Sequence, residues 1–155
     1  MMELQLQVHV KKVDVEKIRP LRHSELRKGQ DFSTTSYLKD YEKDAFHIAC
    51  IVKKKVVTCA TFYPEKSTKI KSENAYRLRG MATASNFQRK GYATGLMTES
   101  FKELKEKKCD LLWCNARLVA VDFYKSVRLK IIEEIFDIEG IGPHYYMYKE
   151  INLNK

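Results

Sequence analysis

The sequence predicts an α/β (α+β) fold in a single domain covering residues 1–155. Six to seven short runs rich in apolar and β-branched residues are typical of strands, and two stretches carry apolar residues at helical spacing. Between residues 75 and 127 the order is strand, loop, helix, strand, helix, which predicts a right-handed βαβ crossover. The length allows one domain with its own core and is short for two ordinary domains.

The first part of the chain predicts a strand, short helical pieces and a hairpin. Residues 4–10 alternate apolar and polar side chains, as a half-buried strand does. Asp14 is placed to cap a helix, and Pro20 makes the preceding residues a poor helix interior, so residues 15–28 are predicted to hold short helical pieces and a loop. Two β-branched runs, 45–52 and 56–63, flank three lysines and predict a hairpin.

A βαβ unit and a final hairpin are predicted for the remainder. A polar loop at 64–73 leads to a strand at 75–83, and a helix follows with Lys105, Lys107 and Lys108 in its last turn, where cations complement the helix dipole. The apolar stripe of this helix is Ala93, Leu96, Met97, Phe101 and Leu104. The later elements are a buried strand at 109–114, a helix at 118–127, and strands at 131–138 and 145–151 joined by a turn that contains glycines and a proline.

Composition excludes several classes of protein. No apolar run approaches the roughly 20 residues that a membrane span needs. The first residues alternate in polarity and lack the regions of a signal peptide, so we expect a cytoplasmic location without membrane attachment. The four cysteines lack zinc-finger spacing and histidine partners, which predicts reduced core thiols and no metal.

The net charge of +9 is typical either of a nucleic-acid binder or of an enzyme whose cofactor carries phosphates. The basic excess includes residues 86–108, whereas residues 129–155 are acidic on balance. Most aromatic residues fall on predicted core faces instead of interleaving with a basic stripe, which disfavours a nucleic-acid-binding module.

The loop before the long helix carries the pattern Gln88-x-x-Gly91-x-Ala93. Gly91 permits a tight backbone approach, the small Ala93 leaves the next turn uncluttered, and the helix start directs N–H groups into the loop. Such a loop suits a diphosphate, and an unpaired strand edge at Met81 and Thr83 suits an extended, amide-containing ligand. Coenzyme A has both parts. The loop lacks the Gly-Lys-Ser/Thr ending of a P-loop, and no Gly-x-Gly-x-x-Gly motif of dinucleotide-binding proteins follows the first strand.

In this strand–loop–helix context, the Gln-x-x-Gly-x-Ala pattern resembles the acyl-CoA signature of the GNAT acyltransferase superfamily. Residues 113–117, together with Phe123 and Tyr124, look like the fifth strand and fourth helix of that family. The resemblance covers nearly the whole chain, although before residue 45 it is one of pattern only. One departure is Arg128-Leu129, where members commonly carry Gly-Phe.

The resemblance implies a mixed, mostly antiparallel sheet with helices on both faces and a βαβ core that binds acyl-CoA. It also implies an N-acetyltransferase that moves acetyl from acetyl-CoA to a primary amine, on a small molecule, peptide or protein, by direct attack in a ternary complex without a metal. A catalytically silent acyl-CoA-binding regulatory domain is the alternative. The acceptor, the acyl length and the oligomeric state stay open, with a homodimer among the possibilities.

The predicted catalytic residues are Tyr124, Asn115 and His144. Tyr124 is the predicted general acid, and the backbone N–H near Met81 or Ala82 is the predicted oxyanion donor. Asn115 bonds either a cofactor amide or the following backbone, and the alternative for Tyr124 is a core tyrosine. His144 is a candidate general base, with a turn or packing residue as its alternative, and deprotonation of the amine through a water relay is also open. The predicted cofactor-binding residues are Met81, Ala82, Thr83, Gln88, Arg89, Lys90, Gly91, Tyr92, Ala93, Thr94, Asn115, Phe123 and Tyr124.

Overall fold

The computed structural model describes residues 8–139 and 141–151, without the side chains of Glu133 and Glu134. In chain order the strands are β1 (Val8–Lys12), β2 (Phe46–Val52), β3 (Lys55–Pro64), β4 (Ala75–Thr83), β5 (Leu111–Arg117), β6 (Lys130–Ile138) and β7 (Gly142–Glu150). The helices are α2 (Arg19–Leu26), α3 (Tyr92–Glu106) and α4 (Val121–Ser126), with the 3-10 turns η1 (Val15–Lys17), η2 (Phe32–Thr35), η3 (Ser85–Phe87) and η4 (Leu118–Ala120).

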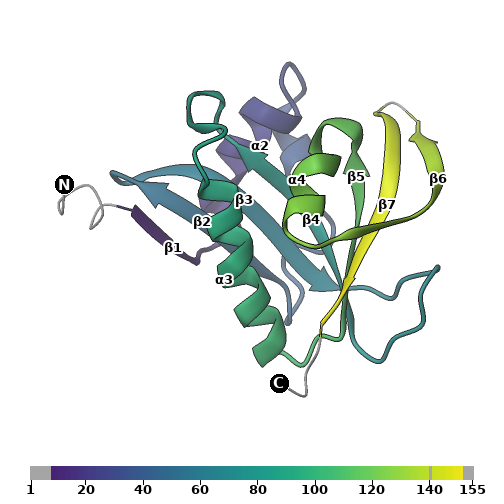
Figure 1. Cartoon of the computed structure of the whole chain (residues 1–155). Coiled ribbons are helices and arrows are strands. Elements are labelled where there is room, and N and C mark those ends of the chain that lie inside the picture. Colours follow the sequence, from purple (N-terminus) through teal and green to yellow (C-terminus); the bar gives the residue numbers. More distant parts are fainter. Residues whose placement is uncertain (1–7, 140, 152–155) are drawn as a thin grey trace. The chain divides into compact units, whose positions relative to one another are not determined.

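The strands form a seven-stranded sheet in the order β1-β2-β3-β4-β5-β7-β6 (Figure 1). β4 and β5 pair in parallel, and the described pairings of β1 with β2, β2 with β3, β5 with β7 and β6 with β7 are antiparallel. The predicted mixed, mostly antiparallel fold is therefore confirmed. The chain divides into two compact units, Met1–Tyr63 with Gly80–Glu103 and Pro64–Arg79 with Leu104–Lys155, which we describe separately. The single domain stays a prediction.

The first unit contains the hairpin expected at the three lysines. Phe46 of β2 lies opposite Phe62 of β3, and the two rings stack with centroids 4.8 Å apart. Lys53 and Lys54 take φ values of 49° and 70°, the left-handed conformations that a two-residue turn between twisted strands requires. The hairpin prediction is confirmed, with the turn formed by residues that adopt this conformation without glycine.

Short helical pieces occupy the predicted stretch after β1. Pro20 lies in the first turn of α2, where its missing N–H costs nothing. Asp14 precedes η1, but its side chain makes no capping bond; only its backbone oxygen accepts, from the Lys17 N–H at 3.0 Å. One face of these pieces packs on the strands through a cluster of Val15, Ile18, Leu21, Ala49, Cys59 and Ala82. Figure 1 shows α3 on the opposite side of β2 and β3 from α2.

The long helix has the buried stripe that its spacing predicts. Leu96, Met97 and Leu104 are fully buried, and Ser100 is buried with its hydroxyl donating to the Leu96 carbonyl at 2.8 Å. Its last turn contains Lys105, whereas residues 107 and 108 lie beyond the helix end. The prediction that three lysines complete the last turn was therefore wrong for two of them.

In the second unit, β5 is longer than predicted and α4 is shorter. The predicted strand at 109–114 begins at Leu111 and continues to Arg117, because β7 pairs with β5 along its whole length as far as Arg117 opposite His144. The predicted helix at 118–127 therefore starts with the 3-10 turn η4 and becomes α-helical only at Val121. Of the predicted first strand at 4–10, residues 4–7 lie outside the described residues.

Candidate active site

The loop between β4 and α3 alternates its backbone handedness. Arg89 has φ 61° and Gly91 has φ 85°, whereas φ of Lys90 between them is not positive. Alternation of this kind turns successive N–H groups toward one concave side, an arrangement suited to anions. A Cβ at Gly91 would meet no protein atom within 4 Å, so the need for glycine lies in the backbone conformation.

The start of α3 adds unpaired donors to this loop. Its first helical hydrogen bond runs from the Gly95 N–H to the Gly91 carbonyl at 3.0 Å, so the N–H groups of Tyr92, Ala93 and Thr94 precede the helical ladder. Positive partial charge gathers at such a helix end. The neighbouring Arg89 and Lys90 are exposed and add their charges to the same region.

Gln88 closes the loop onto the strand before it. Its Nε2 donates to the Thr83 carbonyl at 3.3 Å, and the Ala84 N–H donates to the Val57 carbonyl of β3 at 2.8 Å. The glutamine of the sequence pattern thus ties the loop back to the end of β4, which is a structural reason for an amide at this position.

The strand leading into the loop presents its backbone differently along its length. β4 pairs with β5 only from Ala75 to Arg77, although β4 continues to Thr83. The side chain of Ala82 is buried in the cluster under α2, while Met81 and Thr83 are half-buried. Beyond Arg77, the described register gives β4 no β5 partner.

In the second unit, the β5–β7 register brings two predicted catalytic residues to one face. Asn115 lies opposite Tyr146 and Arg117 lies opposite His144, and directly paired residues share a face of an antiparallel sheet. The buried His144 donates from Nδ1 to the Gly142 carbonyl at 2.7 Å, which leaves the Nε2 lone pair of the neutral ring as an acceptor. The Asn115 side chain is half-buried and forms no hydrogen bond with any residue described.

Tyr124 lies in the helix α4 of this unit and is buried. Burial raises the pKa of its hydroxyl well above the ordinary value, and the neighbouring Cys114 thiol adds to that rise. Cys114 and Asn115 alternate along β5, so their side chains point to opposite faces of the strand. The structure therefore brings Asn115 and His144 to one face of this sheet. Tyr124 lies near Cys114, whose side chain points to the other face. At neutral pH the Tyr124 hydroxyl keeps its proton.

Comparison with known proteins decides the family. The sequence model of the acetyltransferase (GNAT) family matches residues 15–127, which is well over half of the chain. The chain belongs to the GNAT acetyltransferase family. The predictions of this family, of an acetyltransferase and of acetyl-CoA as its acetyl donor are thereby confirmed.

Individual relatives of this GNAT protein agree along its length. YitI of Bacillus subtilis (strain 168), an uncharacterized N-acetyltransferase, is 31% identical over 148 residues, which cover 96% of this chain and 99% of YitI. A putative N-acetyltransferase from Lactobacillus plantarum superposes with a TM-score of 0.77 at 14% identity, covering 94% of this chain and 99% of its own. An aminoglycoside 6′-N-acetyltransferase complexed with coenzyme A gives 0.76 at 12% identity, with 93% and 97% covered. At these identities, the two structures show a shared fold.

Two properties concern the described part of this GNAT protein as a whole. None of its helices between residues 8 and 151 combines the length and apolar character that a membrane crossing requires. Among the residues described, histidine, cysteine and carboxylate side chains do not gather in groups of three that could hold a metal ion.

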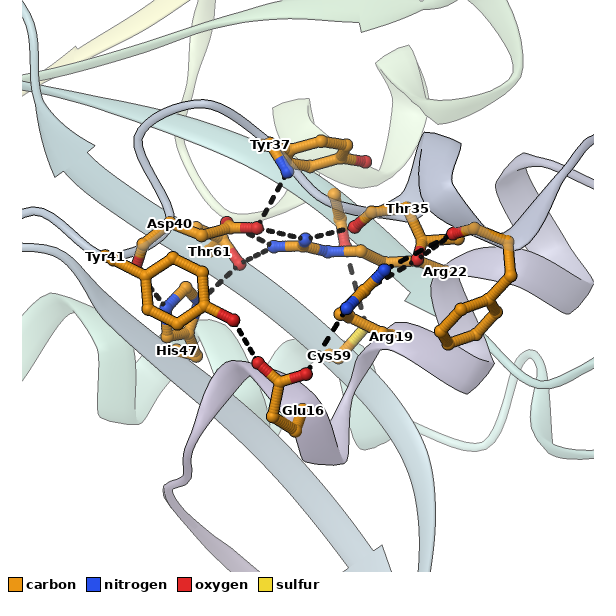
Figure 2. A network of polar contacts seen from close by, with 12 residues as sticks. Glu16, Arg19, Arg22, Thr35, Tyr37, Asp40, Tyr41, His47, Cys59 and Thr61 are labelled. Carbon is orange, nitrogen blue, oxygen red and sulfur yellow. Dashed lines mark hydrogen bonds and ion pairs between the residues drawn. The ribbon is translucent and has the colours of Figure 1, made fainter.

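Sequence reasoning missed a buried polar network in the first unit, which Figure 2 shows. The fully buried Arg22 of α2 forms a two-pronged ion pair with Asp40, at 2.8 Å from Nη1 and 2.9 Å from Nη2. It also donates to the Thr35 carbonyl at 2.7 Å and to the Thr61 hydroxyl at 2.5 Å. A signal for it exists, because Arg22 follows Ile18 and Leu21 at helical spacing and so places a cation on the buried stripe.

His47 joins this network through both nitrogens of its ring. Its Nε2 donates to the Asp40 carbonyl at 3.0 Å, and Nδ1 accepts from the Thr61 hydroxyl at 2.8 Å, which is an arrangement for the neutral ring. Burial is the main cause that lowers the pKa of His47 below its ordinary value. Protonation would oppose the donation from Thr61 and put a second cation beside Arg22.

We expect acid to destabilise the fold through His47. Because the pKa of this histidine is lower in the folded state, the unfolded chain binds the proton more readily; the stability is therefore complete above about pH 6.5 and declines as the pH falls below that value. Urea unfolding between pH 7.5 and 5 measures this decline. His47→Gln should be less stable at pH 7.5 and show a shallower decline, and an equal slope in both proteins would contradict the assignment. Glu16 and Asp31, whose pKa values are lowered, act in a more acidic range.

Proposed function

We propose that this GNAT protein transfers the acetyl group of acetyl-CoA directly to a primary amine within a ternary complex. The observation that carries the proposal is the loop from Gln88 to Thr94, where alternating backbone handedness and the unpaired start of α3 turn N–H donors to one side. Donors arranged in this way match the diphosphate of a coenzyme A ester.

In this proposal, the cofactor is held mainly by backbone groups. The N–H groups from Arg89 to Thr94 bind the diphosphate, with charge from Arg89 and Lys90. The open edge of β4 at Met81 and Thr83 bonds the amide groups of the extended arm, as an added strand would. Asn115, whose side chain has no partner among the described residues, supplies a carboxamide for one of those amides.

The proposed chemistry needs an oxyanion donor and two proton transfers. The amine nitrogen attacks the thioester carbon, the carbonyl oxygen becomes an oxyanion, and the backbone N–H of Met81 or Ala82 stabilises it. The C–S bond then breaks, and the leaving thiolate takes the proton of the Tyr124 hydroxyl, whose raised pKa keeps it protonated until that moment. His144 is our candidate acceptor of the amine proton, since its Nε2 lone pair is not used by the Gly142 contact.

A screen of amines with acetyl-CoA tests the activity. Polyamines, amino acids, aminoglycosides and lysine or amino-terminal peptides are each mixed with the protein, and release of the coenzyme A thiol is followed. We expect release with at least one class of amine and transfer of one acetyl group to its nitrogen, seen by mass spectrometry. Binding of acetyl-CoA without release in any mixture would favour the silent regulatory domain instead.

Tyr124→Phe separates proton donation from cofactor binding. Loss of the hydroxyl should lower kcat by about a hundredfold, which is the usual contribution of a general acid, while the KM for acetyl-CoA stays within about twofold. Tyr148→Phe removes a hydroxyl from a half-buried tyrosine of β7 and serves as the control with normal turnover. An unaffected kcat in the Tyr124 variant would remove the general-acid role and leave a core tyrosine.

We also propose a cytoplasmic location. The four cysteines are all free and buried in the structure, as expected of a protein from a reducing compartment. Fractionation of cells that express the protein with a carboxyl-terminal epitope would test this location.

A further inference from the structure

Gly80 is an irregular point in the middle of β4. Its φ of 66° lies in the left-handed region, although it belongs to a strand that runs from Ala75 to Thr83. A glycine inside a strand often marks a bulge or a close approach by another group. The close approach applies here, because a Cβ at this position would lie 3.1 Å from Nε of Arg22 and 3.1 Å from the ring of Tyr37.

The two side chains that cover Gly80 hold each other in place. The guanidinium of Arg22 stacks on the Tyr37 ring, with its central carbon 3.9 Å from the ring centroid. Asp40 binds both residues, accepting from Nη1 and Nη2 of Arg22 and from the Tyr37 backbone N–H at 2.8 Å (Figure 2). We call the side chains of Arg22 and Tyr37 the Gly80 clamp.

The Nε atom of Arg22 is the part of the guanidinium that faces Gly80 of β4. Nη1 and Nη2 of Arg22 bond Thr35, Asp40 and Thr61, whereas Nε is buried and has no hydrogen-bond partner among the described residues. That Nε and a ring carbon of Tyr37 are the atoms nearest to a Cβ built on Gly80, both at 3.1 Å, so the arginine meets this position by packing and not by a polar bond. From β3, the Cys59 thiol donates to the Gly80 carbonyl at 3.5 Å, and burial raises its pKa to about 12, which keeps it protonated.

We propose that the Gly80 clamp positions the backbone N–H of Met81 for the transition state of acetyl transfer. The peptide plane between Gly80 and Met81 is oriented by the backbone angles of Gly80, and an ordinary extended conformation would rotate it. The clamp and the Cys59 bond hold Gly80 in its left-handed conformation from three neighbouring segments. Arg22 and Tyr37 are therefore positioning residues, which act on the oxyanion donor through Gly80.

This inference rests on the proposed function, and it predicts a particular kinetic signature. A donor aimed at the oxyanion stabilises the transition state more than bound acetyl-CoA, so loss of the clamp lowers kcat and leaves cofactor binding unchanged. A general loss of packing would instead lower stability in proportion to the side chain removed, without regard to its distance from Gly80.

Tyr37→Leu tests the clamp, because it removes the ring over Gly80 and leaves the Tyr37 backbone bond to Asp40 unchanged. We expect kcat to fall by about tenfold to a hundredfold with the KM for acetyl-CoA within about twofold. Tyr37→Phe keeps the ring and should restore most of the turnover. Phe46→Leu is the matched control, since it removes a buried ring of the same unit, stacked on Phe62 and not among the nearest neighbours of Gly80, and should leave kcat unchanged.

Backbone amide resonances give a readout that needs no acceptor. Residual dipolar couplings report the orientation of each N–H bond and are not changed by the ring current of Tyr37, so Tyr37→Leu should change the couplings of the Gly80 and Met81 amides, whereas Phe46→Leu should leave them as in the wild type. Unchanged couplings in Tyr37→Leu, or an equal loss of kcat in both variants, would overturn the clamp. If the wild-type protein transfers acetyl to no amine, the proposed function fails, and these couplings alone still decide whether the clamp sets this backbone.

Discussion

Replacement of Gly91 with valine is expected to abolish measurable binding of acetyl-CoA. Gly91 has φ 85°, where a β-branched residue is a severe outlier, so the loop must change its conformation and redirect its N–H groups. We expect the affinity to fall by at least a hundredfold, about 3 kcal/mol of binding free energy. Isothermal calorimetry with acetyl-CoA measures this directly and needs no knowledge of the amine.

Gly95 offers a matched control four residues further on. It lies inside α3, φ is not positive there, and a Cβ at that position would also meet no protein atom within 4 Å. Gly95→Ala should bind acetyl-CoA normally and unfold at a slightly higher temperature, because alanine favours the helix. Micromolar binding by the Gly91→Val protein would contradict the backbone cradle.

Replacement of Arg22 with methionine is expected to destabilise the fold by about 3–5 kcal/mol. Methionine keeps much of the apolar stem, but Asp40, which is 3% exposed, loses its two-pronged partner and becomes an uncompensated buried charge. Urea unfolding at pH 7.5 measures the change in free energy. Since whole domains are stable by about 5–15 kcal/mol, the variant should fold only marginally.

The double variant Arg22→Met with Asp40→Leu separates the ion pair from the packing around it. With both charges removed, no unpaired charge is left in the core, so the double variant should be more stable than Arg22→Met alone. If the loss of unfolding free energy in the double variant equals the sum of the losses in Arg22→Met and Asp40→Leu, the two residues act independently, contrary to the two bonds between them.

Sequence reasoning reached those parts of the structure in which neighbouring residues specify the conformation. The β2–β3 hairpin follows from two β-branched runs around a polar turn, and α3 follows from its apolar stripe. The loop at Gly91 belongs to the same class, because a glycine before a helix and a closing glutamine are only three residues apart. These local patterns also carried the resemblance to the GNAT family.

The Arg22 network depends on contacts that no local pattern records. Asp40 lies 18 residues beyond Arg22, after a stretch that contains only the short turn η2, so its carboxylate gave no sign of its partner. Gly80 was passed over as an ordinary strand residue, although a glycine inside a strand is itself a signal of a bulge. The sequence also did not show which face of β5 carries Asn115 and which lies near Tyr124, because this follows from the register of β5 against β7.

The four buried cysteines have a practical consequence for the assay of this enzyme. Thiol-detecting reagents react with thiolates, and burial raises the pKa of Cys50, of Cys109 to about 11, and of Cys59 and Cys114 to about 12. A chromogenic aromatic disulfide added to the native protein will therefore develop colour from released coenzyme A and leave the polypeptide unlabelled. After denaturation the same reagent titrates all four side chains, so one inexpensive dye counts turnover in the native sample and reports the unfolded fraction in an ageing one.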